Sequence, residues 1–163
     1  MIIVDTNIIS TFCRVDKLSL LFKLFPKQKF GIPAAIFNEI IKAVQTGYSF
    51  LEKINHFIES DELKLLSLTA DELLSKQYLP DSFGAGDLEC IIISQRQSHI
   101  LLTNDKRMRN YCLSNNIVVY DLPAVLRTMW KNGIISKNRL KNLVCEIEEK
   151  DNILIKNKEE IYK

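Results

Sequence analysis

The sequence has few of the residues that usually bind zinc, with two histidines and four cysteines in 163 residues. No two cysteines form a Cys-x-x-Cys pair, and neither histidine lies near such a pair. This spacing argues against a zinc site, and we expect buried free thiols in a reducing compartment. The cysteines are Cys13, Cys90, Cys112 and Cys145.

Long apolar runs and an excess of one charge are also missing. No stretch approaches the roughly 18–20 apolar residues that span a bilayer, and residues 1–4 have the pattern of a strand rather than of a basic leader. We therefore expect a cytoplasmic protein without membrane contact. Because the net charge is only +2, any nucleic-acid contact must come from a local basic face.

Glycine and proline are few as well, five and four respectively. With 47% hydrophobic and 26% charged residues, the composition is that of a globular protein and not of a disordered one. The length suits one domain, which we predict over residues 1–150. For the tail, 151–163, the sequence leaves three states open: a continued helix, an edge strand or a frayed end.

Short apolar runs alternate with longer stretches of helical period, which is typical of βα units around a parallel sheet. The pattern predicts strands at 2–4, 30–32, 63–66, 100–103 and 117–120. It predicts helices at 6–14, 18–25, 34–46, 49–59, 70–78, 86–98 and 105–115, and further helices after Pro123 and Ser136. Thr69 and Glu72 form a capping-box pattern, and Gly84 and Gly86 indicate a sharp turn.

Four acidic residues occupy the positions where these elements meet. Asp5 and Asp105 follow predicted strands, whose carboxyl ends open into the ligand crevice of a parallel sheet. Glu39 and Asp87 fall in helix-start patterns. Carboxylates gathered without cations repel one another, so the cluster predicts a bound divalent metal such as Mg²⁺ or Mn²⁺, which prefer oxygen ligands.

Each acid also has a local explanation. Asp5 and Asp105 could cap the helices that follow them, Asp87 could interact with a helix dipole, and Glu39 could be an ordinary surface residue. A shared site explains all four positions at once, and we therefore prefer it.

For each of three further features, the sequence allows two explanations. The basic side chains of Lys106, Arg107 and Arg109 would either grip an RNA backbone or form a solvated helix face. Trp130, in the acid-free stretch 122–145, would be a stacking platform for bases or, as we favour, part of the core. The apolar residues near 18–25 would form either a protein interface or covered core.

Four segments together resemble the acidic motifs of PIN domains. They are Val4-Asp5-Thr6-Asn7, Ile32 to Glu39, Gly84 to Glu89 and Leu102-Thr103-Asn104-Asp105. Their order and spacing are similar to the family's from residue 1 to about 121.

The resemblance implies a three-layer α/β/α sandwich whose five-stranded parallel sheet has the order 3-2-1-4-5. It implies a Mg²⁺- or Mn²⁺-dependent endoribonuclease, in the manner of VapC-type toxins. An antitoxin protein or a second copy of the chain would then be a partner, beside the RNA substrate. The acids carried over as catalytic and metal-binding residues are Asp5, Glu39, Asp87 and Asp105.

Several polar neighbours would position these acids or the substrate: Thr6, Asn7, Glu89, Thr103 and Asn104. Some relatives carry two acids where this chain has Asn104 and Asp105, so the resemblance leaves one metal or two open. On a helix, Glu89 should point to a different side from Asp87.

Other functions remain as alternatives. The chain could be a non-catalytic RNA- or protein-binding module of PIN fold, or a housekeeping RNA-processing nuclease. A phosphatase with a strand-end aspartate nucleophile is less well supported, because Asn7 stands where such enzymes usually carry a second aspartate.

Overall fold

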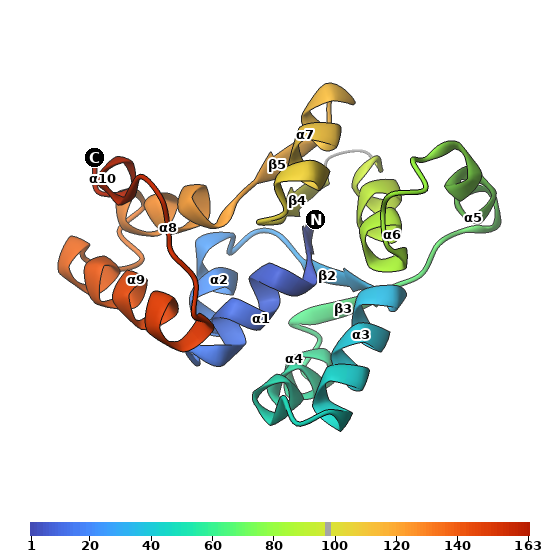
Figure 1. The fold of residues 1–163 in the computed structure, drawn as a ribbon. Helices are drawn as coiled ribbons and strands as arrows, with labels where there is room; N and C mark the ends of the chain where they lie inside the picture. The colour runs from blue at the N-terminus through green and yellow to red at the C-terminus, as the bar shows by residue number, and fades with distance from the viewer. Residues whose placement is uncertain (97–98) are drawn as a thin grey trace.

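The computed structural model of the chain describes residues 1–96 and 99–163 (Figure 1). Five strands form one parallel sheet with the order β3-β2-β1-β4-β5, and helices flank it in a three-layer α/β/α arrangement. The predicted fold class and strand order are thereby confirmed. The strands are β1 (Ile2–Val4), β2 (Phe30–Pro33), β3 (Leu63–Leu66), β4 (Ile100–Leu102) and β5 (Val118–Tyr120).

The helices alternate with the strands, as the apolar pattern predicts. Before β4 they are α1 (Thr6–Arg14), α2 (Leu18–Leu24), α3 (Ala34–Gln45), α4 (Lys53–Glu59), α5 (Ala70–Ser75) and α6 (Ala85–Ser94), with 3₁₀ turns η1 (Ser49–Glu52) and η2 (Lys76–Tyr78). After β4 they are α7 (Lys106–Ser114), α8 (Leu122–Lys131), α9 (Lys137–Asp151) and α10 (Lys158–Ile161).

The burial of each strand follows its place in the sheet. In central β1 all three residues are buried, whereas edge strand β5 exposes both Val118 and Tyr120. Val4 pairs in register with Leu102 of β4. The two central strands therefore end side by side, and the residues that follow them lie at one edge of the sheet.

Some predicted element bounds were wrong. The helix predicted at 86–98 ends at Ser94, with Gln95 as its cap, and residues 97–98 of that prediction lie outside the described residues. The helices predicted at 49–59 and 70–78 each divide into a 3₁₀ turn and an α-helix. The capping box of Thr69 and Glu72 is confirmed.

The prediction that Gly84 and Gly86 are needed for a sharp backbone turn was wrong, because neither residue has a backbone conformation that requires glycine. Gly84 has a φ of −71°, which any residue adopts, and neither glycine has a positive φ. Gly86 is instead required by close helix packing, described below. Gly133 does adopt the left-handed region, with a φ of 72°, directly after α8.

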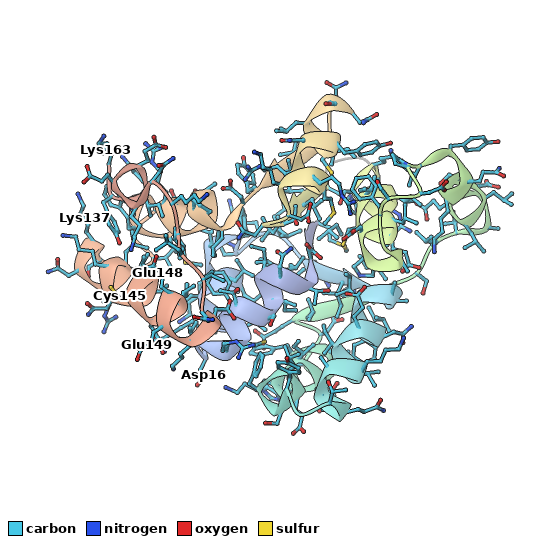
Figure 2. The ribbon with its side chains drawn as sticks, viewed as in Figure 1. Asp16, Lys137, Cys145, Glu148, Glu149 and Lys163 are labelled. Atoms are coloured by element: carbon cyan, nitrogen blue, oxygen red, sulfur yellow. The ribbon has the colours of Figure 1, made fainter. Side chains whose placement is uncertain are left out.

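The C-terminal tail packs against the body of the protein. After α9 ends, the chain returns beside α8, where α10 contacts that helix (Figure 1). The indole nitrogen of Trp130 donates to the carbonyl oxygen of Ile161 at 2.6 Å. Glu148 of α9, labelled in Figure 2, accepts hydrogen bonds from the backbone N–H of Ile155 and from the Lys158 amine, at 2.8 and 2.6 Å. The tail is thus fixed by main-chain and side-chain contacts.

The apolar cluster near residues 18–25 belongs to the core. Leu18 and Leu21 are buried, and the ring of Phe22 packs edge-on against Phe30 with 4.8 Å between ring centroids. This favours covered core over an interface. In the described part of the chain, no helix combines the length and apolarity needed to cross a bilayer.

The expectation of buried thiols was wrong for one cysteine. Cys13, Cys90 and Cys112 are buried, but Cys145 is exposed on α9, where Figure 2 labels it. Its position explains the difference, since the buried stripe of α9 is formed by neighbours such as Val144 and Ile147.

Candidate active site

Asp5 lies at the centre of the carboxyl edge of the sheet. Its N–H continues the strand ladder by donating to the carbonyl oxygen of Leu102 at 3.0 Å, and the residue is only 4% exposed. The Oδ1 atom accepts from the backbone N–H of Thr6 at 2.7 Å, and Oδ2 accepts from the hydroxyl of Thr103 at 2.7 Å. The side-chain amide of Asn7 also donates to Oδ2. Asp5 therefore acts as a helix cap and as a residue held by the neighbouring strand.

The ionised form of Asp5 is poorly stabilised where it lies. Loss of hydration on burial raises the pKa of this carboxyl to about 6, against the lowering effect of the bonds from Thr103 and Thr6. The charges of Asp87 and Glu39 raise it further. No cationic side chain of the described residues forms an ion pair with Asp5. Unbalanced negative charge of this kind fits a bound cation.

Asn7 and Thr103 connect the loops that follow β1 and β4. The Asn7 Oδ1 atom accepts from the backbone N–H of Asn104 at 2.8 Å. The hydroxyl of Thr103 accepts from the backbone N–H of Asp105 at 3.0 Å while donating to Asp5. These side chains therefore hold the two strand ends in a fixed relation.

Glu39 approaches the edge from α3. Its Oε2 atom accepts from the Thr6 hydroxyl at 2.7 Å, and its Oε1 atom lies where a Cβ on Gly86 would be only 2.5 Å away. A Cβ there would also meet the buried side chain of Ile36 at 2.6 Å. The absence of a side chain at position 86 thus lets α6 pack closely on α3 and brings their acids together.

Asp87 lies in the first turn of α6. Its Oδ2 atom accepts from the backbone N–H of Gly84 at 3.1 Å, which is the helix-start role considered for it. The guanidinium of Arg107, from α7, lies 3.8 Å from the same oxygen and 4.8 Å from the ring centroid of Phe83. Arg107 therefore reaches the acidic site from the opposite side.

Asp105 has a local role in addition to its place at the strand end. Its Oδ1 atom accepts from the backbone N–H of Met108 at 2.7 Å, so it caps α7. It is linked to Asp5 through the hydroxyl of Thr103. The local explanations considered for the acids therefore coexist with their gathering at one edge.

Three of the four acids form an electrostatic cluster. The charges of Asp87 and Glu39 both raise the pKa of Asp5, and burial, followed by the charges of all three acids, raises the pKa of Cys90. Among the described residues, however, no three acidic, histidine or cysteine side chains converge closely enough to hold an ion as they stand. Each of the four carboxylates accepts a hydrogen bond from a protein donor instead. Because Mg²⁺ keeps several waters, carboxylates that gather more loosely still suit it chemically.

Glu89 faces away from the cluster. Its carboxylate accepts from the backbone N–H of Ala35 at 2.9 Å and from the Lys76 amine at 3.0 Å. It thereby caps α3, whose own N-cap residue, Pro33, makes no side-chain bond. Sequence reasoning missed this role, although a proline before a helix, with no capping side chain, signals that an acceptor must come from elsewhere.

The basic residues of α7 differ in their contacts. Lys106 is exposed, and Arg107 reaches Asp87. Arg109 forms an ion pair with Asp121. The Oδ1 atom of Asp121 also caps α8, because it accepts from the backbone N–H of Ala124 at 3.0 Å. Sequence reasoning also missed Asp121, although an aspartate just before a Leu-Pro helix start indicates a cap.

Trp130 packs against the core, as favoured from the sequence. The amines of Lys131 and Lys137 lie 4.7 and 5.2 Å from its ring centroid. Two amines thus lie near the indole ring, and its nitrogen is hydrogen-bonded to Ile161. Trp130 is therefore not a free platform for stacking bases.

The five-stranded parallel sheet of order 3-2-1-4-5 is consistent with a PIN-like α/β/α sandwich, and Asp5 and Asp105 follow the ends of its central strands β1 and β4. A family model described as a PIN domain matches residues 1–160, and the chain belongs to the PIN-domain family. PIN domains are generally nucleases that use divalent metal ions. No curated protein matches the chain in sequence.

Proposed function

We propose that this protein is a Mg²⁺- or Mn²⁺-dependent endoribonuclease that hydrolyses RNA phosphodiesters. The proposed metal-site acids are Asp5, Asp87 and Asp105, with Glu39 as a further ligand or as a residue that orients bound water. Membership of the PIN-domain family supports the nuclease class.

The observation that carries the proposal is the state of Asp5. It is a buried carboxylate whose pKa is raised to about 6 by lost hydration and by two neighbouring acids. Burying an uncompensated charge destabilises a fold. A chain that keeps Asp5 there, held by Thr103 and Thr6, is best explained by a cation that binds during function.

The residues around Asp5 have distinct roles in this proposal. Thr103 and Asn7 fix the orientation of its carboxylate, and the Thr6 hydroxyl holds Glu39 toward it. A bound Mg²⁺ or Mn²⁺ would supply Lewis-acid stabilisation of the phosphoryl charge and lower the pKa of water. Arg107, 54% exposed and 3.8 Å from Asp87, would contact a substrate phosphate.

The test is cleavage of labelled single-stranded RNA with Mn²⁺ or Mg²⁺, beside EDTA and purified Asp5→Asn protein. We expect metal-dependent cleavage by the wild-type protein and a loss of at least about a hundredfold in the variant. Asp81→Asn, a change at an exposed acid outside the cluster, serves as the matched control and should cleave normally. Equal products from wild-type and Asp5→Asn protein would contradict the assignment of Asp5.

We further propose that the cellular role is that of a toxin in a toxin–antitoxin pair. Membership of the PIN-domain family and the resemblance of its acidic motifs to those of VapC-type toxins support this role. Expression of the wild-type protein should arrest growth of a host cell, whereas Asp5→Asn should not. Normal growth with an active enzyme would instead favour the housekeeping RNA-processing nuclease.

A second candidate is a non-catalytic RNA- or protein-binding module. It is favoured by one observation, that the acids among the described residues accept hydrogen bonds from protein donors and are not converged on one point. Calorimetric titration with Mn²⁺ separates the two candidates. The nuclease predicts heat of binding that disappears in Asp5→Asn, and the binding module predicts no binding in either protein.

A further inference from the structure

A cavity of about 520 Å³ opens beside the acidic edge, between the start of α8 and the returning tail. It is lined at one end by Asn104, the residue between Thr103 and Asp105, and at the other by residues 153–157. Figure 1 shows this tail segment passing from the end of α9 to α10 beside α8. The volume of the cavity falls within the range of small-molecule sites in proteins, roughly 300–1,000 Å³.

Asn104, which lines the cavity, is linked to the candidate active site by two hydrogen bonds. The backbone N–H of Asn104 donates to Asn7, and the amide of Asn7 donates to Asp5. An extended strand whose phosphate lay at Asp5 would pass Asn104 on its way to the cavity. The cavity is therefore placed to take a nucleotide next to the cleaved bond.

The charges that line the cavity favour an anion. Arg109 and Asp121 pair with each other. This leaves Arg127 and Lys156, both exposed, against one exposed acid, Glu160. Neither Arg127 nor Lys156 forms an ion pair with a described residue. Two uncommitted cations beside a polar opening fit the phosphates of a strand.

Part of the cavity lining is apolar. Pro123 and Ile153 line it, together with Leu154, which is 75% exposed although it lies between two less exposed isoleucines. A flat aromatic ring such as a base can cover these side chains without needing a hydrogen-bond partner from them. The combination of an apolar wall and free cations distinguishes a nucleotide from a purely ionic ligand.

We propose that this cavity binds one nucleotide of a single-stranded RNA substrate that flanks the cleaved bond. Arg127 and Lys156 contact its phosphates, and its base lies against Pro123 and Leu154. This inference rests on the proposed function, because it deepens the description of how that site holds its substrate.

The test is binding of fluorescein-labelled single-stranded RNA, measured by anisotropy in EDTA so that metal-dependent cleavage cannot interfere. The double variant R127Q/K156Q should bind about tenfold more weakly than the wild-type protein. Losing two phosphate contacts should also reduce the slope of log affinity against log salt by about 1.4, at about 0.7 for each contact with a single strand.

A control double variant, K42Q/R139Q, removes one lysine and one arginine that are exposed and outside the cavity. It should change affinity less than twofold. Leu154→Ala should weaken binding severalfold and leave the salt slope unchanged, because it removes an apolar contact and no charge.

Equal affinity of R127Q/K156Q and wild type, or an equal loss in K42Q/R139Q, would overturn the proposal, as would a wild-type protein that binds no RNA. The outcome is separate from that of the cleavage assay. Binding that depends on the cavity without any cleavage would refute the nuclease and retain the cavity. Cleavage by the wild-type protein together with unchanged RNA binding in R127Q/K156Q would support the nuclease and refute the cavity as a nucleotide site.

Discussion

Asp5 combines a capping role with a raised pKa, and the two have opposite effects on stability. Its carboxylate is bonded by Thr6 and Thr103, but lost hydration and neighbouring acids raise its pKa from 3.8 to about 6. Below the unfolded-state value the carboxyl is neutral in both states and this residue imposes no charge penalty. Between about pH 4 and pH 6 the unfolded chain ionises while the folded carboxyl stays protonated, so stability falls over this range, and the loss is complete once the folded state carries the buried charge above about pH 6.

The first prediction concerns this pH dependence at the residue scale. In EDTA, the wild-type protein should lose about 2 kcal/mol of unfolding free energy between pH 4 and pH 8 because of Asp5 alone, most of it below pH 6. Asp5→Asn should lack that component, so its melting temperature should depend less on pH over this range. Thermal melts of wild type, Asp5→Asn and the control Asp81→Asn check it.

Parallel curves for wild type and Asp5→Asn would show that burial of Asp5 carries no such penalty. Added Mn²⁺ gives a second check, because a bound cation favours the ionised carboxylate. Metal affinity should then fall as the pH drops below about 6, by up to about tenfold per pH unit for one linked proton.

At the scale of secondary-structure elements, the site depends on how closely α3 and α6 pack. Gly86 lies against Glu39 and Ile36, and Glu89, one turn further along α6, caps the start of α3. One helix therefore supplies both the close approach and the missing cap of the other. The acids of the two helices meet because of this pairing.

The second prediction is that Gly86→Ala displaces Glu39 and strains the packing of α6 on α3. The new Cβ would lie 2.5 Å from Glu39 Oε1 and 2.6 Å from Ile36 Cδ1, so we expect a loss of about 1–3 kcal/mol in unfolding free energy. Cleavage should also fall, because Glu39 is displaced. Gly84→Ala, whose Cβ would meet Asp87 Oδ2 at 3.8 Å, should cost at most about 1 kcal/mol as an N-cap change.

A double-mutant cycle identifies the cause. In the Glu39→Ala background, Gly86→Ala should cost at least about 0.5 kcal/mol less, because one of the two clashes has gone. Urea unfolding measures all four proteins. An identical cost of Gly86→Ala in both backgrounds would exclude contact with Glu39 as its cause.

At the scale of the whole molecule, the tail connects the last helices to the body of the protein. Trp130, the only tryptophan of the chain, donates to the carbonyl of Ile161, and Lys131 donates to that of Lys163 at 2.6 Å. Ile155 is buried, and its backbone N–H donates to Glu148 of α9. Intrinsic fluorescence therefore reports whether the tail is docked.

The third prediction is that deletion of residues 153–163 exposes Trp130. Its emission should shift to longer wavelength and become more accessible to acrylamide, and the melting temperature should fall. Leu154→Ala is the control, because this side chain is 75% exposed and its loss leaves the docked contacts in place. Unchanged emission after the deletion would contradict the packing described for the tail.

The sequence predicts the parts of this fold that depend on local pattern. The apolar runs of β1 and β4 and the capping box at Thr69 can be recognised without knowledge of distant neighbours. The roles of Gly86 and Glu89 depend on which helices meet in three dimensions. They cannot be read from local composition.

The same distinction applies to the candidate site. Strand ends and helix starts indicate Asp5, Glu39, Asp87 and Asp105 as candidates. The sequence does not show that Asp105 bonds to Met108 or that Arg109 is paired with Asp121, since those bonds depend on side-chain orientation. The cavity beside Asn104 likewise requires the tail to fold back over α8.

The central claim is that the acids at the carboxyl edge bind a divalent cation. The most direct measurement is an electron paramagnetic resonance titration with Mn²⁺ at pH 8, in which the free-ion signal reports how much metal is bound. The account predicts saturable binding to the wild-type and Asp81→Asn proteins, and loss of that binding in Asp5→Asn. Equal binding to wild type and Asp5→Asn, or none to either, would contradict it.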